Sequence, residues 1–152
     1  MQNLNIEAFK IIGISVKTTN ENNQSAKDIG NLWNKFMTEN ILEKIPNKIN
    51  NDIYSIYTEY EGDHTKPYTT ILGCRVKNFE SVPEGMISKS FEDGNYTKFT
   101  AKGDLTKGVV FEEWMKIWQM DLNRRYIADF EIYGEKAKNP KGAEVEIFIG
   151  IH

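Results

Sequence analysis

The chain is poor in the residues that form disulfides and transition-metal sites. Cys74 is the single cysteine among 152 residues, so an internal disulfide is excluded, and its apolar, strand-like surroundings predict a small buried thiol. The two histidines, His64 and His152, have no cysteine or second histidine at ligand spacing. We therefore expect neither a metal nor a cofactor.

Long apolar runs are also lacking. No stretch approaches the ~20 apolar residues that a membrane-spanning helix needs, and residues 1–7 have neither the basic nor the apolar part of a signal peptide. The sequence therefore predicts a cytoplasmic protein without a membrane partner.

Charge of one sign is not concentrated anywhere along the chain. The net charge is −3, from 19 basic and 22 acidic residues that are interspersed. Direct binding of DNA or RNA usually requires a basic stripe that faces the phosphates, so this class of function is disfavoured. The small acidic excess weakly favours neutral or cationic partners.

The chain does contain regular strand and helix patterns, and its length and 39% apolar content predict one domain over residues 1–152. Alternating apolar and β-branched residues predict strands over 9–16, 53–61, 68–76, 86–91, 96–101, 125–134 and 144–151, with a tight turn at 92–95. A capping-box pattern predicts a helix from Ser25 that ends at Pro46. A second helix is expected over 109–118, with Asp104 or Thr106 as its cap.

The two halves of the chain, about 4–80 and 84–151, have the same order of elements. Each reads as a strand, a helix with tryptophan, and two further strands, and alignment of Gly62 with Gly134 places Glu59 opposite Glu131. A βαββ unit has a sheet face that its single helix covers only partly. Two such units would therefore leave a cleft between them, where a ligand is expected to bind.

Residues 125–134 hold acids inside an aromatic strand. Alternation places Ile127, Asp129, Glu131 and Tyr133 on one face, and it places Tyr126, Ala128, Phe130 and Ile132 on the other, which is expected to be core. One interpretation is a half-exposed strand with Glu131 in water; the other is a partly dry binding wall, in which a buried carboxylate needs a cation or hydrogen-bond donors. The pattern alone favours the exposed strand.

Five segments together resemble a known family. They are 82–86 (Val-Pro-Glu-Gly-Met), 94–103 (Gly-Asn-Tyr-Thr-Lys-Phe-Thr-Ala-Lys-Gly), the helix through Trp118, 126–134 (Tyr-Ile-Ala-Asp-Phe-Glu-Ile-Tyr-Gly) and 144–150 (Glu-Val-Glu-Ile-Phe-Ile-Gly). In this order and at these intervals they resemble the GyrI-like or AraC-type effector-binding domains. This family includes the ligand-binding domains of multidrug-responsive transcription regulators and many stand-alone proteins.

The resemblance implies an α+β fold of duplicated βαββ units with pseudo-twofold symmetry, two helices on an antiparallel sheet and a central ligand cleft. It implies that the cleft binds lipophilic, often cationic small molecules, and that Glu131 rather than Asp129 reaches into it. Tyr133 belongs to the same motif as Glu131, and Tyr96 to another. The other aromatic candidates for the cleft are Trp33, Tyr57, Tyr68 and Trp118. The regulators carry a helix-turn-helix domain that this sequence lacks, so we expect a stand-alone binding protein.

Two other functions stay open at this point. A branch of the family resembles small-molecule hydrolases that open strained electrophilic rings; Glu131 would then be a general base and Tyr96 or Tyr133 a proton donor. No independent nucleophile motif supports this activity, so no catalytic residue is assigned. The third function is a protein-binding module with a regulator or DNA gyrase as its partner, for which the sequence has no exposed apolar helix.

Overall fold

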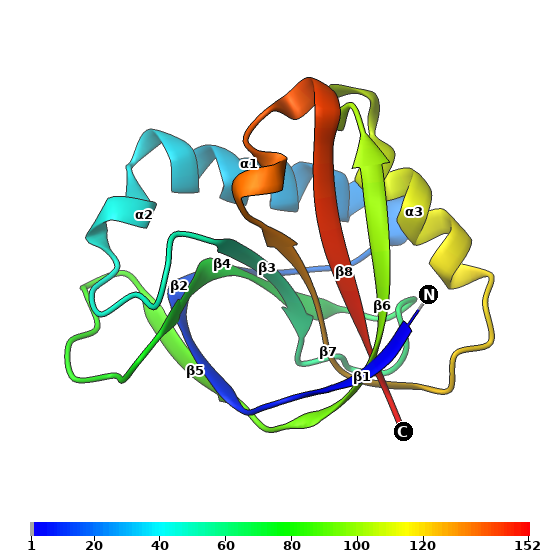
Figure 1. Ribbon diagram of the computed structural model, residues 1–152, viewed down its shortest axis with the longest axis horizontal. Coiled ribbons are helices and arrows are strands. Elements are labelled where there is room, and N and C mark those ends of the chain that lie inside the picture. Colours follow the sequence, from blue (N-terminus) through cyan, green and yellow to red (C-terminus); the bar gives the residue numbers. More distant parts are fainter. Residues whose placement is uncertain (1) are drawn as a thin grey trace.

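The computed structural model describes residues 2–152, which form one antiparallel sheet of eight strands in the order β1-β6-β8-β7-β3-β4-β2-β5 (Figure 1). The strands are β1 (Gln2–Ile6), β2 (Phe9–Thr18), β3 (Ile53–Thr58), β4 (Tyr68–Val76), β5 (Ile87–Phe91), β6 (Gly94–Gly103), β7 (Arg124–Tyr133) and β8 (Ala143–Ile151). The helices are α1 (Gln24–Thr38), α2 (Ile41–Lys44) and α3 (Val109–Trp118). None of the helices within residues 2–152 is long and apolar enough to cross a membrane.

The strand order is symmetric about the pair β3 and β7. Outward from this pair, one side reads β3, β4, β2, β5 and the other reads β7, β8, β6, β1. The α+β fold with a duplicated pattern, two longer helices and an antiparallel sheet is therefore as predicted. The boundaries of the two repeats, 4–80 and 84–151, stay a prediction.

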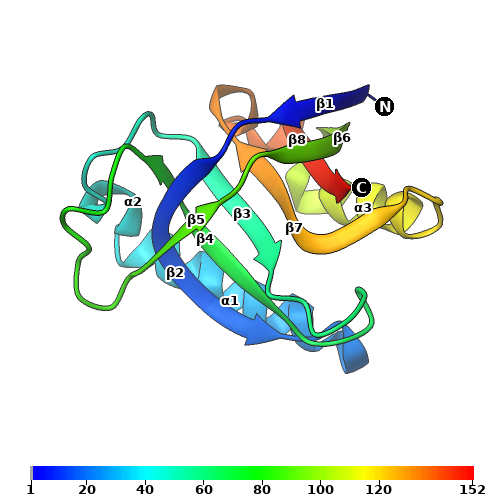
Figure 2. The ribbon, with the colours of Figure 1, turned by 90° about the horizontal axis from the view of Figure 1, so that it is seen from below.

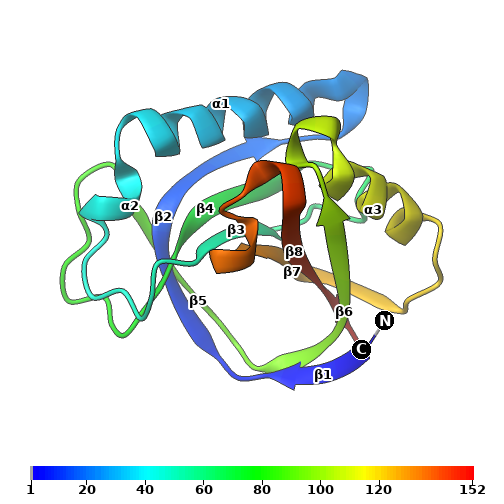
Figure 3. The same cartoon turned by 45° about the horizontal axis from the view of Figure 1, so that its top comes forward.

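The two halves are joined by two long, bent strands. β1 continues into β2 and β5 continues into β6, and the pairing register is unbroken, since Ile6 lies opposite Gly94 and Phe9 opposite Phe91. The sheet consequently curls around on itself (Figure 3). The segment 92–95 is therefore not the turn of a hairpin, because β5 pairs with β2 while β6 pairs with β1 and β8.

Both longer helices lie on the same side of the curled sheet, as Figures 1 and 3 show. In the view from below, β2 and β5 lie in front of α1 (Figure 2). An apolar cluster under α1 contains Phe36 and Leu72, and another under α3 contains Ile117 and Ile147. A third cluster, around Phe130, fills the inside of the curl. The sheet thus has apolar packing on both faces, so a polar side chain buried on either face needs hydrogen-bond partners.

The first helix differs from its prediction at both ends. It begins at Gln24 after Asn23, which has a left-handed backbone and makes no side-chain cap, so Ser25 lies inside the helix. It ends at Thr38, because Asn40 has a positive φ of 53° that interrupts the α-helical backbone before the short α2 begins. The second helix spans its predicted apolar stripe, but the predicted cap is wrong, because Gly108 precedes the helix and provides no side-chain cap. Asp104 instead accepts a hydrogen bond from the backbone N–H of Thr106 in the short turn of 3₁₀-helix before it.

Two further expectations concern single residues. Cys74 is buried, as predicted, and burial raises the pKa of its thiol to about 11. The predicted strand 53–61 is too long, because β3 ends at Thr58 and Glu59 has a positive φ of 52°. Glu59 is exposed and forms an ion pair with Lys89 at 3.0 Å, so it is not the structural counterpart of Glu131.

Candidate functional site

Glu131 lies two residues before the end of β7, which is flanked by β3 and β8 near the centre of the sheet. Its side chain is only 2% exposed. The interpretation favoured by the sequence pattern, in which Glu131 faces water, is therefore wrong. Alternation is correct from Ala128 onward, since Ala128 and Phe130 are buried in the interior cluster, but it is broken at Tyr126. The face that holds the acid is buried as well, because the helices cover it.

Three hydrogen-bond donors from three different elements surround the Glu131 carboxylate. The Tyr57 hydroxyl of β3 and the Trp114 Nε1 of α3 donate to Oε2 at 2.8 and 2.7 Å, and the Tyr133 hydroxyl donates to Oε1 at 2.6 Å. Ser55 in turn donates to the Tyr57 hydroxyl at 3.3 Å. All of these donors are neutral, and Glu131 forms no ion pair with any residue in 2–152.

The surroundings of Glu131 shift its proton affinity and those of its neighbours. Burial raises the pKa of the Glu131 carboxyl, and the hydrogen bonds from Tyr133, Tyr57 and Trp114 offset part of this rise. Burial and the nearby carboxylate raise the pKa of Tyr57 and of Tyr133 well above that of a free phenol. Both phenols therefore keep their protons, and Glu131 is a buried acid whose hydrogen-bond partners are all neutral.

The second acid of β7, Asp129, is fully buried too, but it has a cationic partner. Its Oδ2 accepts hydrogen bonds from Arg124 Nη2 at 2.8 Å and from the Tyr60 hydroxyl at 2.5 Å, while the backbone N–H of Gly150 donates to Oδ1 at 2.8 Å. The two buried acids of this strand thus differ in their pairing: Asp129 is neutralised by Arg124, and Glu131 is not.

An aromatic pocket of about 110 Å³ opens between α1, the strands β3 and β4, and α3. Tyr57 and Trp114 line it and also donate to Glu131, so they form the wall between the pocket and the carboxylate. Their rings meet edge to face, with centroids 5.5 Å apart. The residues that line the pocket are Asn20, Ser25, Ile29, Tyr57, Tyr60, His64, Tyr68, Phe111, Trp114, Trp118 and Arg124.

The rim of the pocket is formed by side chains that are partly in water. His64 stacks on Trp118 with centroids 5.7 Å apart and an interplanar angle of 10°, and Phe111 packs edge to face on Trp118. Phe111 is 58% exposed. Burial and the nearby Arg124 guanidinium lower the pKa of His64, so its ring is neutral over a wider pH range than that of a free histidine.

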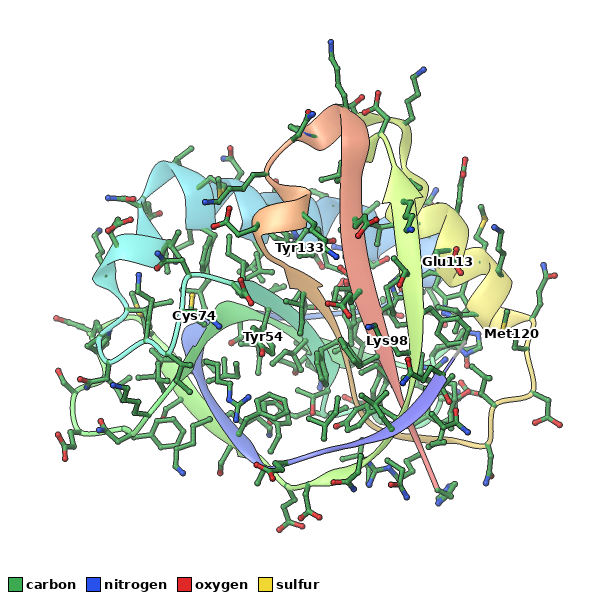
Figure 4. The ribbon with its side chains drawn as sticks, viewed as in Figure 1. Tyr54, Cys74, Lys98, Glu113, Met120 and Tyr133 are labelled. Atoms are coloured by element: carbon green, nitrogen blue, oxygen red, sulfur yellow. The ribbon has the colours of Figure 1, made fainter. Side chains whose placement is uncertain are left out.

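The structure brings most of the predicted ligand-binding residues together. Tyr57, Tyr68 and Trp118 line the aromatic pocket, and Glu131 lies directly behind its wall. Tyr133 lies on the far side of Glu131, where its ring meets Trp33 with centroids 4.9 Å apart. In Figure 4, Tyr133 lies near the top of β7, next to the loop that leads to β8.

Tyr96 does not join this group. It points into the interior cluster on the other face of the sheet, where its ring meets Phe130 with centroids 5.3 Å apart. It lines a different cavity, together with Arg125. The motif that contains Tyr96 did not predict which face of the sheet its side chain occupies. The strand β6 does not pair with β7, since β8 lies between them.

Of the eleven residues that line the pocket, only Tyr57, Tyr68 and Trp118 were predicted from the sequence. The residues that sequence analysis missed are Asn20, Ser25, Ile29, Tyr60, His64, Phe111, Trp114 and Arg124. Trp114 lies four residues before Trp118, a spacing that places both rings on one face of α3 and could have indicated it. Tyr60 and Arg124 lie just outside the regular part of their strands, where alternation no longer predicts direction. Within residues 2–152 there is no group of three or more His, Cys, Asp or Glu that is arranged to hold a metal ion.

Residues 4–151 match the family described as Cass2, the integron-associated effector binding proteins. The chain belongs to this family. This result confirms the resemblance to GyrI-like effector-binding domains. An integron cassette protein from the mobile metagenome of Vibrio cholerae has a similar structure, with a TM-score of 0.78 and 30% identity over 99% of this chain and 95% of that one.

Two further proteins match this chain over nearly its whole length. The protein YobU of Bacillus subtilis (strain 168) is 23% identical over 150 residues, which are 96% of this chain and 94% of YobU. The structure of SAV2435 bound to tetraphenylphosphonium has a TM-score of 0.81 at 15% identity and covers 99% of this chain and 93% of that one. The likeness to SAV2435 is one of fold.

Proposed function

We propose that this Cass2-family protein binds lipophilic organic cations in the aromatic pocket, with Glu131 as the charge partner. The observation that carries the proposal is the pairing of Glu131: it is 2% exposed, it accepts three neutral hydrogen bonds, and it has no cation within residues 2–152. A buried carboxylate without a counter-ion is costly for the folded protein. A cation that enters the pocket would remove part of this cost.

The pocket wall suits a cation with aromatic or other apolar substituents. Tyr57, Tyr68, Trp114 and Trp118 present ring faces and edges, and each ring face attracts a positive charge by about 0.5–2 kcal/mol. A neutral ligand of the same shape would leave Glu131 without a partner, so charge selects among ligands. The fold neighbour SAV2435 was captured with tetraphenylphosphonium, a cation of this class.

Arg124 restricts where the positive charge of a ligand can lie. Its guanidinium also lines the pocket and packs over the Tyr126 ring at 4.3 Å. The ion pair with Asp129 neutralises this charge, but a ligand cation would still avoid it. The charge of the ligand is therefore expected beside Tyr57 and Trp114, in front of Glu131, and its apolar groups toward Trp118.

The size of the pocket implies that its rim moves when a ligand binds. The volume of about 110 Å³ is well below the ~300–1,000 Å³ that is typical of pockets for drug-sized ligands. The side chains that must turn outward are those at the rim, because they border solvent and can move without passing through the buried core. They are Phe111, Trp118 and His64. We therefore propose that a bulky cation opens the pocket by rearranging these rings.

No observation favours hydrolysis over binding. Both Glu131 oxygens accept hydrogen bonds from Tyr57, Trp114 and Tyr133, and the first two of these side chains separate Glu131 from the pocket. A general base must reach the proton that it removes, directly or through one water molecule. Tyr96, the other proton donor considered from the sequence, lies on the opposite face of the sheet.

Isothermal titration calorimetry with tetraphenylphosphonium tests the proposal. The wild type should bind this cation, and Glu131→Gln should bind it at least about tenfold more weakly, because the amide keeps the shape but not the charge. Triphenylphosphine oxide is a neutral ligand of similar shape, and the variant should bind it with the same affinity as the wild type does.

A matched control is Glu112→Gln on α3, which removes an exposed charge outside the pocket and should leave affinity unchanged. Equal affinity of the wild type and Glu131→Gln for tetraphenylphosphonium would contradict the role of Glu131. If the wild type binds neither probe, the proposed function itself is wrong.

A further inference from the structure

A second cavity of about 440 Å³ lies beside strand β7, away from the aromatic pocket. Tyr60 is the one residue that lines both. The wall of the second cavity comes from the end of β3, from β5 and the segment after it, from the start of β6 and from β7. The residues that line it are Thr58, Glu59, Tyr60, Lys89, Ser90, Phe91, Glu92, Asp93, Tyr96, Arg125, Tyr126, Ile127 and Ala128.

An irregularity in β7 places two successive arginines in different cavities. Between Arg124, which pairs with Ile151, and Asp129, which pairs with Ile149, the register of β7 against β8 shifts. Tyr126 lies inside this bulge and has a positive φ of 56°, a conformation that is strained for an aromatic residue. As a result, Arg124 lines the aromatic pocket and Arg125 lines the second cavity.

The two arginines differ in their partners. Arg124 forms the buried ion pair with Asp129, whereas Arg125 forms no ion pair with residues 2–152 and has the Tyr96 hydroxyl as a neutral hydrogen-bonding neighbour. The Nε of Arg125 is buried without a hydrogen-bond partner within this part of the chain. The unpartnered Nε needs an explanation, because buried donors are almost always paired in folded proteins.

Packing against Tyr96, Gly94 and Gly150 holds Arg125 in place. Its Cζ lies 5.8 Å from the centre of the Tyr96 ring, and a Cβ on Gly94 would come within 2.5 Å of its Nη2. A Cβ on Gly150 would come within 3.4 Å of the same atom. Gly94 and Gly150 thus leave the space that the guanidinium fills, and its planar fork is oriented before any ligand arrives.

The other charges of the cavity do not neutralise Arg125. Lys89 and Glu59 pair with each other at 3.0 Å, and the two remaining acids, Glu92 and Asp93, are exposed at the rim and form no ion pair within residues 2–152. The rest of the wall is largely apolar, from Phe91, Tyr96, Tyr126, Ile127 and Ala128. Ile127 is 59% exposed and adds to this apolar wall.

From this combination, we infer that the second cavity is a binding site for small organic carboxylates with an aromatic or aliphatic body. The carboxylate would accept two parallel hydrogen bonds from the Arg125 guanidinium, which is the geometry that arginine favours. The body of the ligand would cover Ile127 and the rings of Phe91 and Tyr126. The site is separate from the cation pocket and takes ligands of the opposite charge.

Calorimetric titration with 2-naphthoate tests the inference, with 2-naphthalenemethanol as the neutral probe. The wild type should bind the acid more tightly than the alcohol, and Arg125→Gln should weaken binding of the acid by at least about tenfold without affecting the alcohol. Arg125→Lys, which keeps the charge but not the fork, should lie between them. Lys102→Gln, an exposed charge outside the cavity, is the matched control and should change nothing.

Methyl NMR shifts of Ile127 and Ala128 on addition of 2-naphthoate locate the ligand and do not require the glutamine variant to fold. Tetraphenylphosphonium affinity should stay unchanged in the Arg125 variants, which separates a failure of this site from a failure of the cation pocket. Equal binding of 2-naphthoate by the wild type and Arg125→Lys, or no methyl shift at these two residues, would overturn the inference.

Discussion

Arg124 and Asp129 lie five residues apart on one strand and form an ion pair of 2.8 Å in which the side chains are only 6% and 0% exposed. The bulge of β7 makes the pair possible, because regular strand geometry would hold side chains five positions apart on opposite faces of the sheet. The pair sits between the aromatic pocket and the interior of the sheet. Its removal therefore affects both stability and binding.

Asp129→Asn should lower the free energy of unfolding by about 3–5 kcal/mol, since it leaves the Arg124 guanidinium buried without a counter-ion. Urea denaturation measures the change. The exposed Asp93→Asn is the control and should stay within about 0.5 kcal/mol of the wild type. The double variant Arg124→Gln with Asp129→Asn should lose less than the sum of the single changes. If Asp129→Asn lowers the free energy of unfolding by less than about 1 kcal/mol, the Arg124–Asp129 ion pair is accessible to water in solution.

Cation affinity should depend on pH through Glu131. Because burial raises the pKa of this carboxyl, it takes up a proton at a higher pH than an exposed glutamate does. Affinity for tetraphenylphosphonium, whose charge does not titrate, should be constant at high pH. Below the raised pKa it should fall about tenfold for each pH unit.

Calorimetry over a pH series measures this dependence, and Glu131→Gln should lose it. His64 is the other titratable group near the rim, and its positive charge at low pH would also oppose a cation. His64→Gln should therefore keep the Glu131 dependence. A flat profile in the wild type would contradict the assignment of Glu131 as the charge partner.

Glu131→Gln should also make the unliganded protein more stable at neutral pH. The pKa of Glu131 is higher in the folded state than in the unfolded chain, so its folded-state contribution is fully present below the unfolded pKa. That contribution is lost as the pH rises through the raised, folded-state pKa. The variant should thus match the wild type at low pH and exceed it in free energy of unfolding near pH 7.

Denaturant titrations at several pH values measure whether the free energy of unfolding of the variant exceeds that of the wild type. If the variant is less stable than the wild type at neutral pH, the hydrogen bonds from Tyr57, Trp114 and Tyr133 outweigh the desolvation of the charge. The main role of Glu131 would then be to stabilise the fold through these hydrogen bonds.

Trp118→Ala should reduce affinity for tetraphenylphosphonium by about threefold to thirtyfold, which corresponds to the loss of about 0.5–2 kcal/mol from one ring face. Trp118 is only partly buried at the pocket rim, so the cost in stability should be modest. Met120→Ala is the control: Met120 is 40% exposed, lies just beyond the helix and does not line the pocket. Unchanged affinity in Trp118→Ala would mean that the bound cation does not reach the rim.

The sequence predicted the fold well where periodicity is long and regular. The strands 68–76 and 125–134 and the helix 109–118 lie within a residue of their expected positions. The predictions failed where single residues adopt left-handed backbone conformations. Asn40 ends the first helix early, Glu59 ends β3, and Tyr126 interrupts the alternation of β7. Asparagine tolerates this conformation, but nothing local in the sequence marks Glu59 or Tyr126.

The candidate site was predictable only in part. The acid of 125–134 could be found from its aromatic surroundings, and the family resemblance selected Glu131. Alternation placed Tyr133 beside Glu131, but the contacts of Tyr57 and Trp114 could not be derived, because β3 and α3 are brought to β7 only by tertiary packing. The distinction between Glu131 and Asp129 depends on Arg124, whose position follows from the bulge.

The hydrogen bond from Trp114 Nε1 to Glu131 also gives the protein an internal spectroscopic reporter. An indole N–H that donates to a carboxylate in a dry site resonates far downfield, and its chemical shift follows the charge of that carboxylate. Three tryptophans give three such signals, of which Trp114 is the one bonded to the buried acid. Occupancy of the pocket can therefore be followed through a single resonance, without a label on the ligand or a change to the chain.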